Sequence, residues 1–317
     1  MTKPTVSIFG YGKVGTAVAE RLWDLGFAIE PVAVGSKESI VETSFGEKMA
    51  IIKPKEYINT IINTGLNASF IVVCTPGEVL EEYLNDLLIA RKPLIILSTN
   101  YDEVYVKTKC EELNISCVMS QNMALPILEM WDIFEKLQNI EFDEEINLLL
   151  ARESHPGFKK DISGTLIKTL SIFESKGIKN TFDLEKAKAL YLKDEDYSYN
   201  EVFWNRNPQT QINEYDFIES KFMEAHAYHS YTIEGDNSND SQCYLQYLYD
   251  RLKGLEKYSN KHLQFIINIS DNKNMLFITH NINGRSIYGD GVAASIEFLQ
   301  KNRGVFTGVD VMKSIAK

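Results

Sequence analysis

The sequence has few of the residues that build disulfide frameworks, zinc sites or membrane spans. It contains only four cysteines, whose positions form no CxxC pair and no zinc-ligand spacing. Reduced thiols are the simplest account, so we expect a cytoplasmic protein. No apolar run reaches the length of a membrane span, and nothing at the N-terminus has the pattern of a signal peptide. The net charge of −11 argues against nucleic acid or an anionic membrane as the main partner.

The length and the distribution of charge indicate a protein of more than one domain. With 317 residues, 44% of them hydrophobic, the chain is long enough for two domains of ordinary size. Most of the acidity comes from residues 194–258, which hold thirteen acids and five bases. The same segment holds nine tyrosines and Trp204, so its composition is not simply that of a disordered chain.

A glycine-rich motif lies between a predicted strand, residues 6–10, and a predicted helix, residues 14–25. This context is the one in which G-x-G-x-x-G binds a dinucleotide. The first glycine permits the tight turn, the second lets a pyrophosphate approach the backbone, and the third lets helix and strand pack closely. The alternative is a glycine-rich turn without a ligand. The candidate cofactor-binding residues here are Gly10, Tyr11, Gly12, Lys13, Val14 and Gly15.

The end of the next predicted strand, residues 28–34, bears on the choice of cofactor. An acid at this position would bind the ribose 2′-hydroxyl of NADH, but Gly35 stands there and Glu38 comes slightly late. Ser36 and Lys37 would suit a 2′-phosphate instead. We therefore favour NADPH, with NADH possible; the alternative is that Lys37 is a solvated loop lysine.

Three more strands, at residues 69–74, 94–97 and 115–119, alternate with helices at residues 78–90 and 102–113. This alternation predicts a doubly wound parallel sheet. Ligands bind at the carboxyl ends of such strands, so the polar turns there predict one cofactor groove, although each could be a plain helix cap. These turns contain Thr75, Pro76, Ser98, Thr99, Asn122 and Met123.

After Pro126 the pattern changes to a helix at residues 128–137 and an apolar strand at residues 146–151. The stretch from Glu153 to Thr165 then leads into a helix that extends to residue 175. Its Ser-Gly-Thr turn offers backbone N–H groups and two hydroxyls to a carboxylate. His155 could transfer a proton near neutral pH, and Lys159 or Lys160 adds positive charge. The alternative is a capped surface helix with solvated lysines.

The remainder of the chain predicts a second domain on an open, mixed or antiparallel sheet. Its expected strands are residues 226–233, 263–269 and 275–282, and its expected helix is residues 243–258. A helix at residues 292–299 and the last residues close the chain. Residues three apart in a strand face opposite sides, so His226 and His229 should not share an ion, and we predict no metal site.

Motifs along nearly the whole chain, apart from the acidic segment, resemble those of the dihydrodipicolinate reductase family. They occur in the family's order: Gly10-Tyr-Gly-Lys-Val-Gly15, Ser120-Gln-Asn-Met123, Glu153 to Thr165, Thr279-His-Asn-Ile-Asn-Gly-Arg285 and Tyr288-Gly-Asp-Gly-Val-Ala-Ala294. The resemblance implies NAD(P)H-dependent reduction of 4-hydroxy-tetrahydrodipicolinate in diaminopimelate and lysine biosynthesis. It also implies a homo-oligomer, usually a tetramer.

The resemblance assigns expected roles to the motif residues. His155 takes the place of the acid-donating histidine, and Lys159 takes that of the motif lysine. The substrate carboxylates would be held by Ser163, Gly164, Thr165 and Arg285. The nicotinamide end would be touched by Ser98, Thr99, Asn122 and Met123, with methionine in place of the family's aromatic residue.

Two departures from the family pattern concern the substrate. Pro156 stands in place of a second histidine, and the proline before Ser163 is missing. One alternative is therefore a related reductase that acts on another cyclic or imine dicarboxylate. Another is an NAD(P)-binding sensor without turnover.

The expected fold is α/β, with an N-terminal Rossmann domain and an α+β domain on an open mixed sheet. We expect residues 1–126, completed by residues 286–317, to bind the dinucleotide. Residues 127–285 should bind a small dicarboxylate and form the oligomer, with residues 194–258 as an acidic, tyrosine-rich insert.

Overall fold

The computed structural model divides the chain into two compact units. Unit 1 is Met1–Leu128 together with Arg285–Lys317, and unit 2 is Glu129–Gly284. The structure describes residues 3–64, 67–137, 146–157, 162–180, 196–199, 202–205, 223–236, 238–258, 263–269 and 274–315. Within these ranges no helix combines the length and apolar character needed to span a membrane.

Unit 1 is built on an eight-stranded sheet in the order β14-β7-β6-β5-β1-β2-β4-β3. All neighbouring strands are parallel except β3 and β4, which form an antiparallel edge pair. The strands are β1 (Thr5–Phe9), β2 (Ala28–Val34), β3 (Ser39–Glu42), β4 (Lys48–Ile52), β5 (Phe70–Val73), β6 (Leu94–Ile96), β7 (Cys117–Met119) and β14 (Val305–Thr307).

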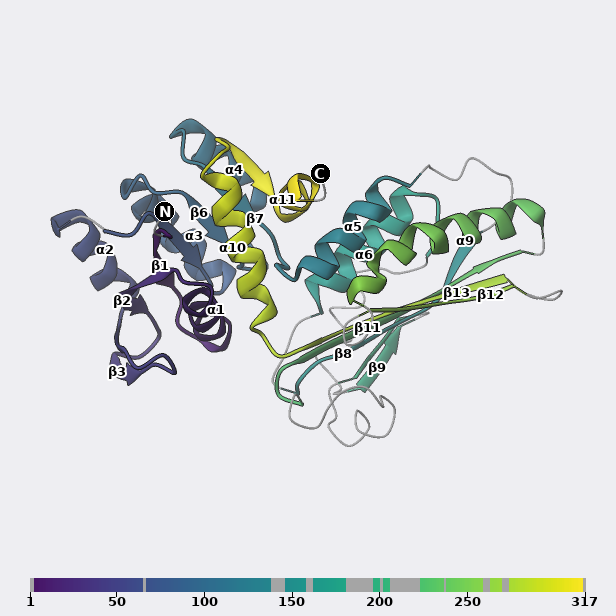
Figure 1. Ribbon diagram of the computed structural model, residues 1–317, viewed down its shortest axis with the longest axis horizontal. Helices are drawn as coiled ribbons and strands as arrows, with labels where there is room; N and C mark the ends of the chain where they lie inside the picture. The colour runs from purple at the N-terminus through teal and green to yellow at the C-terminus, as the bar shows by residue number, and fades with distance from the viewer. Residues whose placement is uncertain are drawn as a thin grey trace. The chain divides into compact units, whose positions relative to one another are not determined.

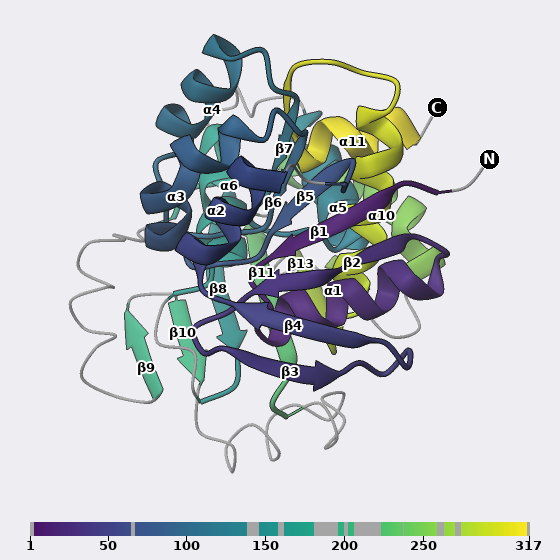
Figure 2. The same ribbon diagram turned by 90° about the vertical axis from the view of Figure 1, so that its left-hand side faces the viewer.

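Helices cover both faces of this sheet, so its central strands are buried on two sides. One face carries α2, α3 and α4, and the other carries α1, α10 and α11 (Figure 2). Each helix layer packs on its own apolar cluster, around Leu80 and Leu84 on the first face and around Val18 and Ile296 on the second. The helices are α1 (Lys13–Asp24), α2 (Pro54–Thr64), α3 (Gly77–Ile89), α4 (Glu103–Glu112), α10 (Ile287–Leu299) and α11 (Gly308–Ile315).

Unit 2 is built on a six-stranded sheet in the order β12-β13-β11-β8-β10-β9. The pairing of β10 with β8 is parallel and the other pairings are antiparallel, so the sheet is mixed. The strands are β8 (Ile146–Ser154), β9 (Asp196–Tyr199), β10 (Val202–Asn205), β11 (His226–Gly235), β12 (Leu263–Ile269) and β13 (Asn274–Asn283).

Helices α5 (Leu125–Glu135), α6 (Gly164–Ser175) and α9 (Asn239–Leu252) lie along one face of this mixed sheet (Figure 1). Phe173 of α6 is fully buried, and its ring contacts Phe134 of α5 and Tyr231 of β11 at centroid distances of 5.1 and 5.5 Å. Full burial of one such side chain contributes about 1.5–3 kcal/mol to the stability of the fold. The sheet and helices therefore form one core that fixes the start of α6.

The predicted fold class is confirmed, and several element boundaries are corrected. The helix predicted at residues 243–258 is α9, Asn239–Leu252, followed by a 3-10 helix, Lys253–Tyr258. Helix α5 begins at Leu125, earlier than predicted, because a proline is tolerated in the first turn of a helix. The elements β3, β4 and α2 were not predicted. Two short strands, β9 and β10, lie in the acidic segment.

Candidate active site

The glycine-rich loop follows β1 at the carboxyl edge of the parallel sheet, and its tightness explains two of its glycines. Gly10 has a φ of +116°, and a Cβ there would lie 2.7 Å from the backbone of Cys74 and Thr75. A Cβ on Gly15 would lie 1.8 Å from the carbonyl oxygen of Gly10. Only glycine fits either position, so the loop is held close to its own helix and to the neighbouring strand.

The middle glycine has a different environment, which fits a bound diphosphate. Among the described residues, no atom outside the adjacent residues and the nearby backbone of the helix lies within 4 Å of the position that a Cβ on Gly12 would take. Gly12 is the N-cap of α1, whose first turn contains no acidic residue, and no side chain caps it. A helix start with open space and no competing carboxylate is a site where a phosphate oxygen can accept backbone N–H donors. Lys13 is exposed and Val14 half-buried at the same turn.

A cavity of about 330 Å³ lies beside this loop at the carboxyl end of β2. Its walls include Tyr11, Ser36 and Lys37, three of the predicted cofactor-binding residues. They also include the carboxylates of Glu20 and Glu42, which sequence reasoning missed because it looked for an acid only at the strand end. Burial, and secondarily Glu20, raise the pKa of Tyr11, so its phenol stays neutral and can donate a hydrogen bond.

The predicted turns after β5, β6 and β7 include two hydroxyls suited to a ligand. Thr75 and Ser98 are 8% and 2% exposed, and neither hydroxyl has a hydrogen-bond partner among the described residues. Buried hydroxyls are seldom left unsatisfied, so both fit positions that contact a cofactor. Pro76 is the N-cap of α3, and Thr99 is half-buried.

The turn after β7 is placed differently from the other two. The side-chain oxygen of Asn122 accepts a hydrogen bond from Ala124 N at 2.8 Å. Met123 is 1% exposed and packs in the core of unit 1, where its backbone closely approaches Gly291. Sequence reasoning expected a nicotinamide contact from both residues, but the structure uses the Met123 side chain as core.

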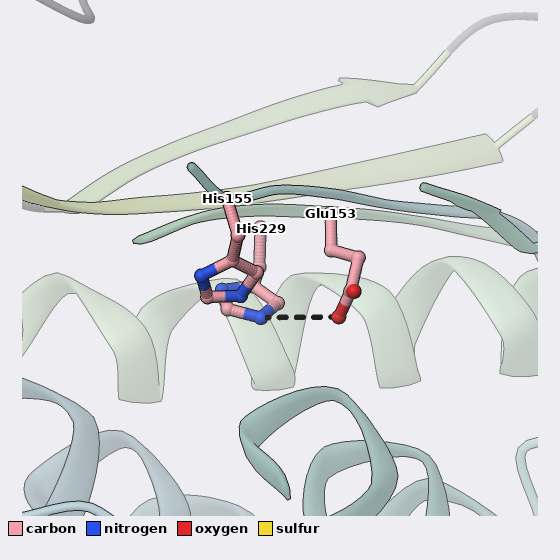
Figure 3. Close-up of side chains that lie close together, drawn as sticks. All are labelled: Glu153, His155 and His229. Carbon is pink, nitrogen blue, oxygen red and sulfur yellow. Dashed lines mark ion pairs between the residues drawn. The ribbon is translucent and has the colours of Figure 1, made fainter. Parts of the chain in front are cut away.

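Unit 2 brings together the side chains of Glu153, His155 and His229, which all leave the sheet on the same side (Figure 3). Glu153 lies in β8 and faces His229 of β11 in the antiparallel register. His229 Nε2 lies 3.8 Å from Glu153 Oε2, and its ring meets that of His155 edge-on at 5.1 Å. All three side chains are less than 8% exposed, so the two imidazoles and the carboxylate interact in a poorly solvated place.

The predicted Ser163 turn lies against this cluster. Ser163 is the N-cap of α6, and its Oγ accepts a hydrogen bond from Thr165 N at 3.2 Å. Its own N–H donates to Glu153 Oε2 at 3.1 Å, and its Oγ lies 3.0 Å from His229 Nε2. The structure thus brings His155, Ser163, Gly164 and Thr165 into one neighbourhood. It also corrects the expectation of free N–H groups, because Glu153 and Ser163 already bind two of them.

His229 is the site residue that sequence reasoning missed. The sequence raised it only as a possible metal ligand with His226, which instead bonds Ser154 Oγ and the Met223 carbonyl oxygen, both at 2.9 Å. The proximity of His229 to Ser163 depends on the pairing of β8 with β11, which a single sequence does not reveal. Knowing the register would have identified it, because Glu153 and His229 are direct partners.

A third imidazole, His280 of β13, extends the cluster across the sheet. It is the register partner of His229, and the two rings stack at 4.5 Å. Its side chain is 1% exposed, and neither ring nitrogen has a hydrogen-bond partner among the described residues. Burial lowers the pKa of His280 to about 3, so this ring is neutral at physiological pH.

The carboxylate and the two histidines could also be considered as a metal site. Each offers one ligand atom, and these atoms lie within 4.8 Å of one another. Zinc and iron(II) accept such donors. However, Glu153 Oε2 and His229 Nε2 already bind Ser163, so the geometry favours a hydrogen-bonded network.

Two further predicted site residues are Lys159, expected to be catalytic, and Arg285, expected to bind the substrate. Lys159 lies outside the described residues. Arg285 follows Gly284, whose φ is +84°, and begins the second stretch of unit 1 just before α10. It is half-buried, and its charge acts on Tyr288 by lowering the pKa of that phenol, although burial raises it more.

Comparisons with known proteins bear on the family resemblance of the motifs. No family model matches the chain. The chain is 22% identical over 328 residues to a probable 4-hydroxy-tetrahydrodipicolinate reductase 1, chloroplastic, of Oryza sativa subsp. japonica, covering 95% of this chain and 76% of that protein. A dipicolinate-bound dihydrodipicolinate reductase from Paenisporosarcina sp. TG-14 matches with a TM-score of 0.56 and 14% identity, covering 97% and 98% of the two chains.

A less similar structure is aspartate semialdehyde dehydrogenase II from Vibrio cholerae, with a TM-score of 0.49 and 12% identity over 95% of this chain and 99% of that one. The sequence comparison with the rice reductase and the fold comparison with the bacterial one agree. The resemblance to the dihydrodipicolinate reductase family, first indicated by the motifs, is confirmed.

Proposed function

We propose that the chain is an NAD(P)H-dependent reductase that converts 4-hydroxy-tetrahydrodipicolinate to tetrahydrodipicolinate. The observation that carries the proposal is the neighbourhood of His155 and the Ser163 turn in unit 2, in a chain with an open dinucleotide loop in unit 1. The rice relative, of which this chain covers 76%, is named as a probable reductase of this kind, and the bacterial neighbour is described as dipicolinate-bound. Both support a small cyclic dicarboxylate as the substrate.

The cofactor would be held by the Gly10–Gly15 loop, the cavity lined by Lys37, and the buried hydroxyls of Thr75 and Ser98. When bound, a reduced nicotinamide would supply a hydride to the ring carbon from which the substrate's hydroxyl leaves as water, a loss that makes a C=C bond conjugated with the imine. NADPH is our preferred form because Ser36 and Lys37 can bind a 2′-phosphate. Glu20 and Glu42 in the same cavity weaken that preference, so NADH should also be used.

The residues of unit 2 are proposed to bind the dicarboxylate and to supply the proton. Negative charge develops on the substrate as it is reduced, and His155 would donate the proton that neutralises it. The Ser163–Thr165 turn would hold one carboxylate, with Lys159 and Arg285 supplying positive charge. Glu153 accepts a hydrogen bond from Ser163 N and fixes the turn against the sheet.

The direct test is a steady-state assay with freshly generated 4-hydroxy-tetrahydrodipicolinate and either NADPH or NADH. We expect turnover with both cofactors, loss of turnover in Lys159→Ala, and normal turnover in Lys168→Ala, which removes an exposed lysine from α6. Expression in a lysine auxotroph that lacks this reductase should restore growth. The absence of both turnover and rescue would reject the proposal.

A second candidate substrate is favoured by Pro156, which is buried next to His155 and offers no side-chain donor. The same chemistry would then act on another cyclic imine or unsaturated dicarboxylate. Turnover of such a compound without rescue of the auxotroph would favour this second candidate. Cofactor binding without any turnover would instead support a sensor.

We also propose a homo-oligomer, a tetramer by analogy with the family. Light scattering coupled to gel filtration measures this directly. A mass near 36 kDa, the mass of one chain, would contradict it.

A further inference from the structure

His229 contacts both Glu153 and Ser163, which are also joined to each other by the hydrogen bond from Ser163 N to Glu153 Oε2. It lies in β11 opposite Glu153, and its Nε2 is 3.8 Å from that carboxylate and 3.0 Å from Ser163 Oγ. Its side chain is 1% exposed, so bulk water does not compete for these contacts. Because Ser163 is the N-cap of α6, His229 is bonded to the residue that fixes the orientation of this turn.

The direction of the bond between His229 and Ser163 decides what the serine can do. A hydroxyl has one hydrogen to donate and two lone pairs that accept. One lone pair of Ser163 already accepts from Thr165 N. If Ser163 donates to His229, no hydrogen is left for an anion. If His229 donates, both lone pairs are filled and the hydroxyl hydrogen is available to a carboxylate.

Glu153 selects between these two directions. Its Oε2 is bonded to Ser163 N and lies 3.8 Å from His229 Nε2. A negative oxygen at that distance stabilises an N–H on the facing ring nitrogen and repels a lone pair there. The other histidine stacked on this ring, His280, is neutral and does not compete for that carboxylate. The charge of Glu153 therefore favours the form of His229 that donates from Nε2.

We propose that His229 is a positioning residue that orients the Ser163 hydroxyl hydrogen toward a bound substrate carboxylate. The inference rests on the proposed function, because it assumes that the Ser163 turn is a carboxylate site. It assigns His229 no proton transfer to the substrate. It also gives Glu153 a defined role: this carboxylate fixes the donor state of His229 as well as the backbone of Ser163.

Two substitutions separate a donor role from simple packing. A glutamine places its side-chain N–H₂ near the position of the histidine Nε2, whereas an asparagine is shorter and reaches only the position of Nδ1. We therefore expect His229→Gln to retain dicarboxylate affinity within about 3-fold and His229→Asn to lose about 10-fold, the loss of one hydrogen bond. His226→Gln, on the same strand and equally buried, is the matched control and should bind like the wild type.

The measurement is the Kd of pyridine-2,6-dicarboxylate by calorimetry on the full chain, with the Kd of NADPH measured in parallel. Ser163→Ala should lose about 10-fold in dicarboxylate affinity. The double variant Ser163→Ala/His229→Asn should lose no more, because both substitutions remove the same hydrogen bond from the Ser163 hydroxyl to the carboxylate. NADPH affinity should be unchanged in all variants. In turnover, His229→Asn should raise KM and leave kcat nearly unchanged.

Several results would overturn the inference. Equal losses in His229→Gln and His229→Asn would make His229 a packing residue, and a fall in kcat at constant KM would make it a proton donor. Additive losses in the double variant would separate it from Ser163. Should neither His229 variant fold, Ser163→Ala decides alone: unchanged dicarboxylate affinity rejects the inference, because the hydroxyl that His229 orients would then hold no carboxylate.

Failure of the proposed function is distinguishable from failure of this inference. A wild-type chain that binds the dicarboxylate and reduces no imine, with the expected loss of affinity in His229→Asn, would reject the reductase and keep the positioning role. A wild-type chain that turns over normally, with His229→Asn unaltered in KM, would keep the reductase and reject the positioning role. A chain that binds no dicarboxylate rejects both.

Discussion

Adding one methyl group at Gly15 should lower the stability of the fold, whereas the same group at Gly12 should keep the stability and weaken cofactor binding. At Gly15, a Cβ would lie 1.8 Å from Gly10 O, where an ordinary contact is 3.4 Å or more, so the loop must move by about 1.6 Å. We expect Gly15→Ala to lose at least about 3 kcal/mol of stability, because a backbone oxygen inside a tight turn cannot be moved like a side chain.

At Gly12 the same methyl group meets no atom of the described chain within 4 Å beyond the adjacent residues and the nearby helix backbone, and the backbone φ of −85° suits alanine. Gly12→Ala should therefore keep the wild-type stability within about 1 kcal/mol. If a diphosphate approaches this backbone, however, the methyl group should occupy its place and weaken NADPH binding by at least ~10-fold.

The assay combines urea unfolding with titration of NADPH fluorescence on each variant. Stable Gly12→Ala with wild-type affinity for NADPH would refute the assignment of the loop as a diphosphate site. Wild-type stability of Gly15→Ala would refute the packing argument on which the loop geometry depends. Each substitution serves as the control for the other, since both add the same group to the same motif.

Three other predictions concern single side chains. His155→Ala should lower kcat by ~10²–10⁴-fold with NADPH affinity unchanged, and wild-type turnover would remove its role as the acid. Lys37→Ala should raise KM for NADPH several-fold and leave KM for NADH unchanged, because only the former carries a 2′-phosphate; equal changes would place Lys37 in solvent. His280 has a pKa of about 3 in the folded chain against 6.5 for an ordinary histidine, so the unfolded chain binds more protons between these values. Stability should therefore fall as the pH drops below about 6.5, by up to ~1.4 kcal/mol per pH unit, and His280→Phe should reduce that slope in urea unfolding at pH 5 and 7.

The parts of the site that the sequence could predict are those held within one short segment. The glycine loop needs only a strand, a tight turn and a helix start, and all three follow one another between residues 5 and 24. The Ser163 turn is likewise a local helix start, with its cap bond formed two residues along the chain. Local spacing contains this information because each function depends on backbone groups that are neighbours in sequence.

The parts that escaped prediction depend on contacts between distant segments. His229 lies 66 residues from Ser163, and their bond exists only because β11 pairs with β8. Met123 matched a family position, but the approach of Gly291 from α10 buries it in the core. The edge strand β3 was missed for a different reason, since it is largely exposed and has no apolar alternation.

Pro156, which stands where the family motif has a second histidine, has two structural consequences. It removes a side-chain donor, and it also biases the backbone of His155 toward extended conformations, because the helical region is disfavoured for a residue before proline. His155 is held at the end of β8, where its ring meets His229 edge-on. An imidazole from β11 thus lies beside the motif histidine. The chemistry of such a site is set by which imidazoles and carboxylates the sheet register brings together, and only in part by the order of residues in the motif.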